Sequence, residues 1–239
     1  MRNEPSSRQP LAPVTPPTHV LRTRLMLCVG GFAALLLCLL VLGSIAEEIQ
    51  ANEAIALDAL ATPLLHSLAN PTLDASMNVL TDLGSTIIIA PLFVLALVLL
   101  IWRRHWGEAV FVTVAMAGSL VLNQSLKLVF HRPRPQLDWA QVQPEYSFPS
   151  GHAMNSLVFY GAIALIVWVL FGHRAGLISA VLAIVLTLLI GTSRVYLGYH
   201  YVTDVVGGFL AGAAWLLIVA AAFRGAVGLR RRHAEPSGP

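Results

Sequence analysis

The sequence predicts an all-α protein, built as a bundle of six transmembrane helices. Of its 239 residues, 56% are hydrophobic and only 11% are charged, and the mean hydropathy is +0.73. Soluble domains carry about 25% charged residues, so a water-soluble core of this size could not enclose so much apolar surface. The apolar residues also fall into runs long enough to cross a hydrocarbon layer of ~30 Å.

Six stretches without Asp, Glu, Lys or Arg define the expected helices. They are Leu25–Ala46, Gly84–Trp102, Ala109–Leu126, Ala153–Gly172, Ala175–Ser193 and Val205–Phe223. Only His173 and Arg174 separate the fourth stretch from the fifth, which predicts a tight turn. The small residues at 44–46 resemble a signal-peptide cleavage site, but the first run is longer than a usual signal-peptide core. We therefore expect the first helix to stay in the protein.

The rest of the chain predicts one membrane domain with two tails. We expect residues 25–225 to form the domain, and residues 1–24 and 226–239 to be disordered cytoplasmic tails, since the first is rich in proline and the second in arginine and glycine. The long connection at 47–83 contains acidic residues, leucine and isoleucine but no Lys or Arg. This pattern predicts one or two amphipathic helices at the membrane interface. They would serve either as a packing lid or as a rim where a lipid enters.

The basic residues predict the orientation of the bundle. Eleven of the fifteen Lys and Arg residues fall on one face if the six helices alternate in direction. Cytoplasmic loops carry an excess of basic residues, so we expect this face and both termini to be cytoplasmic in a plasma membrane. Four basic residues lie on the opposite, outer face, where loop bias does not explain them: Lys127, Arg132, Arg134 and Arg194.

These four residues belong to two of three short motifs on this face. The motifs are Lys127-Leu-Val-Phe-His-Arg-Pro-Arg134-Pro135, Pro149-Ser150-Gly151-His152, and Ser193-Arg194-Val-Tyr196-Leu-Gly-Tyr-His200-Tyr-Val-Thr-Asp204. They lie at the outer ends of the third and fifth helices and at the outer starts of the fourth and sixth. Alternation of the helices therefore predicts that all three meet at one depth on the outer face.

The first chemical expectation is a phosphate site. Lys127, Arg134 and Arg194 concentrate positive charge at the membrane edge, where an isolated charge is costly and a bound anion would compensate it. Arginine matches phosphate oxygens in a bidentate way, and lysine adds a compact charge. Ser150 and Gly151 lie where a helix begins, and free N–H groups at a helix start bind anions.

The second expectation is acid–base and nucleophilic chemistry by two histidines. His200 and Asp204 are four residues apart and share a face if that stretch is helical. A carboxylate that orients an imidazole makes His200 the candidate nucleophile. His152 lies beside the anion site and suits a general acid that later helps to activate water. Neither His nor Cys residues show metal-ligand spacing, so we predict catalysis without metal or other cofactor.

With these residues in place, the sequence resembles the type-2 phosphatidate phosphatase family, also called lipid phosphate phosphatases. The family signature is Lys, six residues, Arg-Pro; then Pro-Ser-Gly-His; then Ser-Arg, one residue, Tyr, three residues, His, three residues, Asp. Every signature position is matched between residues 127 and 204. The resemblance implies the same phosphate ligands, acid, nucleophile and Asp partner, and no metal. The vanadium haloperoxidases have a similar site on soluble folds, and the six spans argue against that activity.

Several residues near the motifs have simpler expected roles. Arg132 lies outside the fixed motif positions and is expected to be a surface charge. Tyr196 is expected to pack against the site, and Asn123 to form an interhelix hydrogen bond. Gly208 and Gly212 are expected to allow close packing of the last helix.

The predicted activity is hydrolysis of a lipid phosphate or diphosphate through a phosphohistidine on His200. The substrate classes are undecaprenyl diphosphate, phosphatidylglycerophosphate and phosphatidate, with an isoprenyl diphosphate as the first candidate. The expected partners are the substrate and the bilayer, with no nucleic acid and no obligate protein partner. One alternative is a phosphotransferase with the same intermediate. The other is a lipid transporter, although the spans lack charged residues beyond the motifs.

Overall fold

All of the regular structure in the described part of the chain is helical. The computed structural model describes residues 18–51, 56–140 and 144–234, and within these ranges it describes the side chains of residue 26 and of residues 29–224. The helices are α1 (Thr18–Gln50), α2 (Ala56–His66), α3 (Pro71–Asp82), α4 (Thr86–Trp102), α5 (Trp106–Phe130), α6 (Gly151–Phe171), α7 (His173–Tyr196) and α8 (Val202–Ala234).

The helices confirm the membrane bundle and correct its second span. Within the described residues, five helices are long and apolar enough to cross a membrane: α1, α5, α6, α7 and α8. The expected span at Gly84–Trp102 is not one of them, because α4 is only 17 residues long. It reaches spanning length only together with α3, from which it is bent by 43°. The described part of the chain thus has five candidate spans, or six if the bent pair counts as one.

The ends of the chain differ from the predicted boundaries. Helix α1 begins at Thr18, inside the stretch expected as the first tail, and α8 continues to Ala234, inside the stretch expected as the second. The remaining parts of both predicted tails, residues 1–17 and 235–239, lie outside the described residues.

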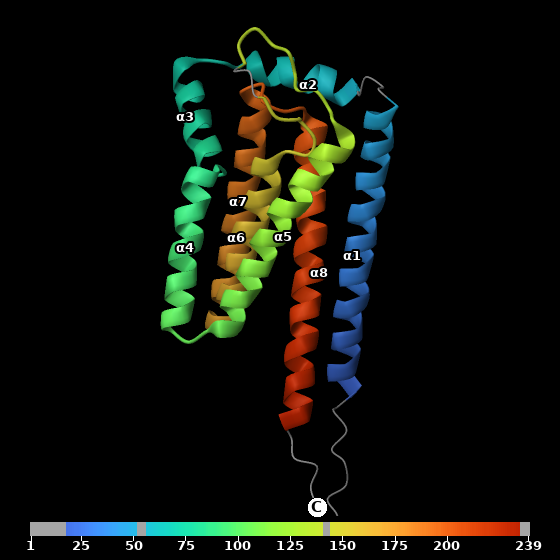
Figure 1. Ribbon diagram of the computed structural model, residues 1–239, viewed down its shortest axis with the longest axis vertical. Coiled ribbons are helices and arrows are strands. Elements are labelled where there is room, and N and C mark those ends of the chain that lie inside the picture. Colours follow the sequence, from blue (N-terminus) through green and yellow to red (C-terminus); the bar gives the residue numbers. More distant parts are fainter. Residues whose placement is uncertain (1–17, 52–55, 141–143, 235–239) are drawn as a thin grey trace, which may run out of the picture. The chain divides into compact units, whose positions relative to one another are not determined.

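The long connection forms two helices with different directions. Helix α2 lies across the end of the bundle, whereas α3 runs toward α4 (Figure 1). Asn70 caps α3, since its side chain accepts a hydrogen bond from the amide of Leu73 at 3.0 Å, and Pro71 occupies the first helical position. Helix α2 packs on α7 and α8, and α3 packs on α7. Only α2 therefore has the transverse placement that the sequence predicts for this region.

The break between α3 and α4 is fixed by close contacts with other helices. The hydroxyl of Tyr160 donates to the carbonyl of Leu83 at 2.7 Å. A Cβ at Gly84 would lie 2.5 Å from a methyl carbon of Ile190, so only glycine fits here without a shift. The bend therefore brings the end of α3 against α6 and α7.

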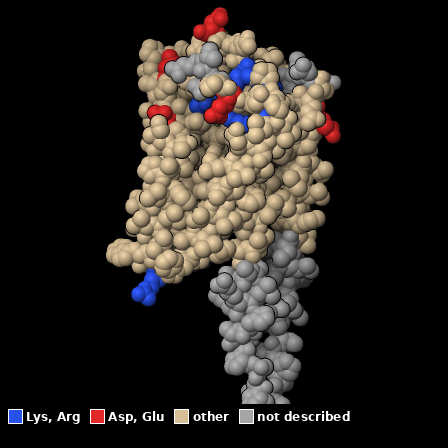
Figure 2. Space-filling view, in the orientation of Figure 1, with Lys and Arg blue, Asp and Glu red and all other residues tan. Residues whose placement is uncertain are grey.

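Helix α6 forms the centre of the bundle and contacts α5, α7 and α8. Its buried side chains, including Val158 and Ala162, pack with Val112 and Ala115 of α5. Charged side chains gather near the two ends, with a broad uncharged band between them on the face drawn in Figure 2. Many apolar side chains of α7 are exposed: Leu177, Ile178, Val181, Leu182, Ile184, Val185 and Leu188. An exposed apolar surface of this kind suits hydrocarbon rather than water.

The two glycines of α8 confirm the predicted close packing. A Cβ at Gly208 would lie 2.7 Å from the carbonyl oxygen of Ser150, and one at Gly212 would lie 3.0 Å from that of Met154. Helix α8 therefore approaches the first turns of α6 at backbone distance. This contact brings the start of α6 next to the start of α8, where the site is built.

Candidate active site

The three sequence motifs meet at one end of the bundle. The ends of α5 and α7 and the starts of α6 and α8 lie together there (Figure 1). A backbone hydrogen bond of 3.0 Å from the amide of Ser150 to the carbonyl of Asp204 joins the second and third motifs. The side chain of Arg134, from the first motif, lies 3.3 Å from the ring of His200, from the third. The predicted convergence is therefore present.

The predicted nucleophile His200 is buried and has a defined tautomer. The residue is 1% exposed. The guanidinium of Arg134 lies 3.3 Å from Nε2, and Nδ1 lies 3.5 Å from Oδ2 of Asp204. A guanidinium can only donate a hydrogen bond, so Nε2 is the acceptor and the ring proton is on Nδ1, facing the carboxylate. The lone pair of Nε2 is thereby directed toward the cationic side of the site.

Burial lowers the pKa of His200 to about 4, and the positive charges of Arg194 and Arg134 act in the same direction. Asp204 opposes this effect but does not cancel it. The imidazole is therefore unprotonated at neutral pH, which is the form that can attack phosphorus.

Asp204 is held by hydrogen bonds at both oxygens. It lies in the first turn of α8, and its Oδ2 accepts from the amide of Tyr201 at 2.8 Å and from the hydroxyl of Ser147. The bond to Tyr201 is the carboxylate half of a capping box, in which an acidic side chain reaches back to the residue before the helix. His200 itself precedes α8, so its pairing with Asp204 arises from the turn and not from the helical face that the spacing suggested.

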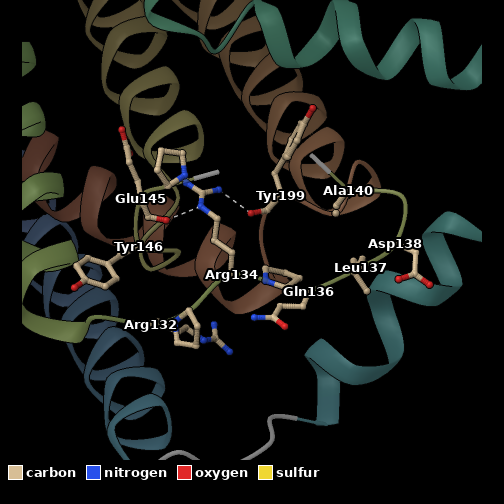
Figure 3. A pocket seen from close by; sticks show the side chains of 13 residues that line it. Arg132, Arg134, Gln136, Leu137, Asp138, Ala140, Glu145, Tyr146 and Tyr199 are labelled. Atoms are coloured by element: carbon tan, nitrogen blue, oxygen red, sulfur yellow. Dashed lines mark hydrogen bonds between the residues drawn. The ribbon is translucent and has the colours of Figure 1, made fainter. Parts of the chain in front are cut away.

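The three predicted cationic ligands are all present, but each already has a partner. Nζ of Lys127 forms an ion pair with Glu145 at 2.5 Å. Arg134 donates from Nε to the carbonyl of Glu145 and from a terminal nitrogen to that of Tyr199, both at 2.8 Å (Figure 3). Arg194 donates to the hydroxyl of Thr81 at 2.8 Å, at the end of α3. A phosphate at Lys127 would therefore compete with the carboxylate of Glu145 for the same ammonium group.

The start of α6 only partly agrees with the expected anion site. The amide of Ser150 is not free, because it donates to Asp204. Its buried hydroxyl, however, has no hydrogen-bond partner among the described residues, and neither has Nε of Arg194. The amide of Gly151 is in the first turn of α6, where N–H groups have no partner within the helix. Unpaired buried polar groups are costly, and an anion would provide an acceptor for the Ser150 hydroxyl and for Nε of Arg194.

His152 occupies a different environment from His200. A Cβ on Gly84 would lie 3.3 Å from Cδ2 of the His152 ring, so the ring packs near the break between α3 and α4. In the described part of the chain no carboxylate pairs with His152. The two histidines therefore differ in the way the sequence predicts, since only His200 has an acidic partner.

The structure corrects the role expected for Arg132. It is not a surface charge, because its side chain is only 12% exposed. It pairs with Asp204 at 2.6 Å and with Asp58 of α2 at 2.7 Å. Burial alone would lower the pKa of Arg132, but the two carboxylates raise it above its ordinary value. The expectation failed because sequence position within a motif says nothing about a partner in α2.

Asp58 and Ser147 also belong to the site and were not predicted. Asp58 is 5% exposed and Ser147 is fully buried. Asp58 is a lone acidic residue in an apolar run, which is the one signal that could have marked it as buried and paired. Asn123 agrees better with expectation, since it forms the interhelix hydrogen bond to Sδ of Met154 in α6 at 3.6 Å and also donates to the carbonyl of Pro149, just before α6, at 3.3 Å. Tyr196 is buried, and its hydroxyl donates to Asp74 of α3 at 2.6 Å.

A cavity of about 620 Å³ opens beside the site. Its walls come from the segment between α5 and α6 together with Gly198 and Tyr199 (Figure 3). Arg134 forms part of the wall and also contacts His200, so it lies between the cavity and the candidate nucleophile.

Comparisons with known proteins identify the family of this chain. The PAP2 superfamily profile matches residues 108–227. Phosphatidylglycerophosphatase B of Bacillus subtilis is 32% identical over 154 residues, which are 64% of this chain and 76% of that protein. The putative undecaprenyl-diphosphatase YbjG of Escherichia coli is 32% identical over 157 residues, 62% of this chain and 75% of that protein.

A solved structure resembles most of the chain. The transmembrane PAP2-type phosphatidylglycerolphosphate phosphatase from Bacillus subtilis superposes with a TM-score of 0.73 and 29% sequence identity. The match covers 80% of this chain and 96% of that one. Family profile, relatives and fold agree, and the chain belongs to the PAP2 superfamily as a multi-span membrane protein and lipid phosphate hydrolase.

Proposed function

We propose that this protein removes the terminal phosphate from a membrane lipid phosphate or diphosphate through a phosphohistidine on His200. The observation that carries the proposal is the state of the His200 ring. Its Nδ1–H faces Asp204 and its Nε2 faces Arg134. An imidazole held in this way has its nucleophilic lone pair directed to the place where cations would bind a phosphate.

In the proposed first step, Nε2 of His200 forms a bond to phosphorus while the bond from phosphorus to the lipid oxygen breaks. Protonated His152 gives its proton to that oxygen, which leaves as a lipid alcohol or as a lipid phosphate. In the second step, His152 takes a proton from water as the water oxygen attacks phosphorus. The P–N bond then breaks, releasing inorganic phosphate and restoring both histidines. Throughout, Asp204 stabilises the positive charge that develops on the ring of His200.

The proposed phosphate cradle consists of Lys127, Arg134, Ser150, Gly151 and Arg194. The unpartnered hydroxyl of Ser150 and Nε of Arg194 support this assignment, because both are buried donors that lack an acceptor in the described structure. Phosphoryl transfer spreads negative charge over the equatorial oxygens, and preorganised cations and N–H groups stabilise it. This arrangement performs the task that Mg²⁺ performs in other phosphatases, so we expect catalysis without metal.

The substrate class follows from chemistry and from the relatives. The cradle suits a terminal phosphate, and the surrounding apolar helices favour one that is carried on a lipid. Relatives are named for phosphatidylglycerophosphate and for undecaprenyl diphosphate. We propose that the substrate is one of these or phosphatidate, with an isoprenyl diphosphate as the first candidate.

We also propose that the site faces the outside of the plasma membrane. Arg103 and Arg104 lie in the turn between α4 and α5, and Arg174 lies at the start of α7. These positions are at the end of the bundle opposite the site. Basic loops mark the cytoplasmic side, so we assign this end of the bundle to the cytoplasm and propose that both termini are cytoplasmic.

The test is phosphate release by the detergent-purified protein in EDTA. The panel is undecaprenyl diphosphate, phosphatidylglycerophosphate, phosphatidate and a water-soluble phosphate ester. We expect release from at least one lipid with EDTA present, and none from a folded His200→Ala variant, which should also bind vanadate weakly or not at all. Full turnover by His200→Ala would refute the phosphohistidine mechanism. Loss of wild-type activity in EDTA, restored by Mg²⁺, would refute metal independence.

A further inference from the structure

Asp58 is a buried carboxylate far from the motifs in sequence. It belongs to α2, outside the part of the chain that the PAP2 profile matches. Its Oδ1 accepts from the amide of Thr203 at 2.9 Å, and its Oδ2 accepts from the Thr203 hydroxyl at 2.5 Å. Oδ2 also accepts from Arg132 at 2.7 Å. A carboxylate with three donors in a buried position is fixed in place.

These contacts make Asp58 a cap for another helix. Thr203 lies in the first turn of α8, whose N–H groups have no partner within the helix. A capping side chain normally comes from the residue just before its own helix, whereas here it comes from α2, 145 residues away in sequence. The negative charge also suits the positive end of the helix dipole. Asp58 therefore fixes the turn of α8 that contains Asp204.

Arg132 connects this cap to the predicted catalytic pair. One terminal nitrogen donates to Oδ1 of Asp204 at 2.6 Å and to the Thr203 hydroxyl at 2.8 Å, and the other donates to Asp58. The guanidinium also lies over the ring of Tyr201 at 4.2 Å. The planar fork of arginine makes these contacts together, which a lysine ammonium cannot do.

The two oxygens of Asp204 therefore have separate tasks. Oδ2 faces His200, and Oδ1 is held by Arg132. Alone, Arg132 would neutralise Asp204 and weaken its attraction for the charge that develops on His200. With Asp58 present, the three charged side chains keep one net negative charge beside the imidazole. The negative charge of Asp58 thus offsets the positive charge of Arg132. Arg132 can then orient Asp204 without neutralising its charge.

We infer that Asp58 and Arg132 are positioning residues for the Asp204–His200 pair, and that α2 is part of the catalytic apparatus. The inference rests on the proposed roles of His200 and Asp204. It goes beyond them because it assigns a catalytic contribution to a helix outside the family match. It also gives the buried position of Asp58 a reason other than packing.

The test compares four variants of the full-length protein in detergent, on a lipid phosphate that the wild type hydrolyses. Asp58→Asn removes the negative charge and keeps the shape of the side chain. Arg132→Lys keeps the positive charge but removes the planar guanidinium with its two donating nitrogens. Asp82→Asn is the matched control, since Asp82 is an exposed carboxylate on α3 of the same connection. His200→Ala is the mechanistic reference. The measurements are kcat, KM, the inhibition constant of inorganic phosphate, and the folded fraction from thermal melts.

We expect kcat per folded molecule to fall about 10- to 100-fold in Asp58→Asn and Arg132→Lys, by analogy with outer-shell residues that orient the ligands of a metal. KM and the phosphate inhibition constant should stay within about twofold, because the interaction acts in the transition state and not in binding. Asp82→Asn should match the wild type. A purely structural role would lower the folded fraction but leave kcat per folded molecule unchanged.

The inference is overturned if kcat per folded molecule of Asp58→Asn is the same as that of Asp82→Asn. Arg132→Lys decides by the same criterion if Asp58→Asn yields no folded protein. If His200→Ala is inactive and Asp58→Asn is fully active, the positioning role of Asp58 is refuted and the proposed mechanism is retained. A fully active His200→Ala removes the proposed mechanism itself.

Discussion

The ion pair between Lys127 and Glu145 predicts that the wild-type protein binds phosphate less tightly than its cradle allows. Lys127 is 7% exposed in its side chain, but Glu145 is 67% exposed. Exposed ion pairs contribute about 0–1 kcal/mol. With one partner buried, we take the upper end, about 1 kcal/mol, which corresponds to about a fivefold change in an equilibrium constant. A substrate phosphate that replaces Glu145 at Lys127 must first overcome this contribution.

The perturbation is Glu145→Gln, which removes the charge and keeps the size of the side chain. We expect KM and the inhibition constant of inorganic phosphate to fall up to about fivefold, with kcat within about twofold of the wild type. Asp138→Asn is the control, because Asp138 lines the same cavity but forms no ion pair in the described structure. It reports the effect of simply removing one negative charge from the rim.

The pH dependence gives a second readout of the same pair. The hydrogen bond and the charge of Lys127 hold the pKa of Glu145 below its usual value. The ion pair between Lys127 and Glu145 is therefore fully formed above pH ~4.5, and it is lost as pH falls through the lowered pKa of Glu145. The difference between wild type and Glu145→Gln should be present at neutral pH and should vanish in acid. A higher KM in Glu145→Gln, or an equal fall in Asp138→Asn, would show that Glu145 does not compete with substrate.

Two further predictions concern the nucleophile and the start of α6. Because the pKa of His200 is lowered to about 4, the acid limb of kcat/KM, where protonation of His200 removes the nucleophile, should lie below pH 5 after correction for ionisation of the substrate and of His152. An acid limb near pH 6.5 would refute this. Because the hydroxyl of Ser150 is buried without a partner in the described residues, Ser150→Ala should leave the thermal midpoint unchanged or raise it. The same change should weaken phosphate inhibition by about 1 kcal/mol, roughly fivefold; a clear loss of stability with unchanged inhibition would contradict the cradle.

The sequence predicted the parts of the structure that depend on local pattern. Hydropathy placed the bundle because a bilayer imposes a fixed length on each span. Alternation of helix direction then placed Lys127, His152 and Arg194 at one end without any knowledge of packing. The second span is the exception, because its apolar run does not show that α3 and α4 share the crossing with a bend between them. That bend depends on contacts such as the one between Gly84 and Ile190, which no local pattern records.

The sequence did not predict the partners of the charged residues. Arg132 and Asp58 are 74 residues apart and pair only because α2 crosses the end of the bundle. A basic residue near the membrane edge usually extends its charge to water, so Arg132 was interpreted as a surface charge. The prediction that the amide of Ser150 is free to bind an anion was wrong for a similar reason. The contact between α6 and α8 lets this amide donate to the carbonyl of Asp204. Hydropathy reports the depth of a residue in the membrane and not its lateral neighbours.

The charges at this end of the bundle explain why a phosphate dianion is a suitable ligand. Four basic side chains meet there in the described structure: Lys127, Arg132, Arg134 and Arg194. Three carboxylates contact two of them: Asp58, Asp204 and Glu145. Asp58 and Asp204 are buried and fixed, whereas Glu145 is largely exposed and can move aside.

The free protein therefore has one uncompensated positive charge at the site, and it has two once Glu145 leaves. A phosphate monoester carries about −1.5 to −2 charges at neutral pH. This charge matches the two positive charges present after Glu145 leaves, and not the single charge present before. Exchange of Glu145 for substrate thus keeps the cluster near neutrality before and after binding, at a depth where excess charge is costly. The same exchange also works in reverse, because Glu145 can return to Lys127 as inorganic phosphate departs.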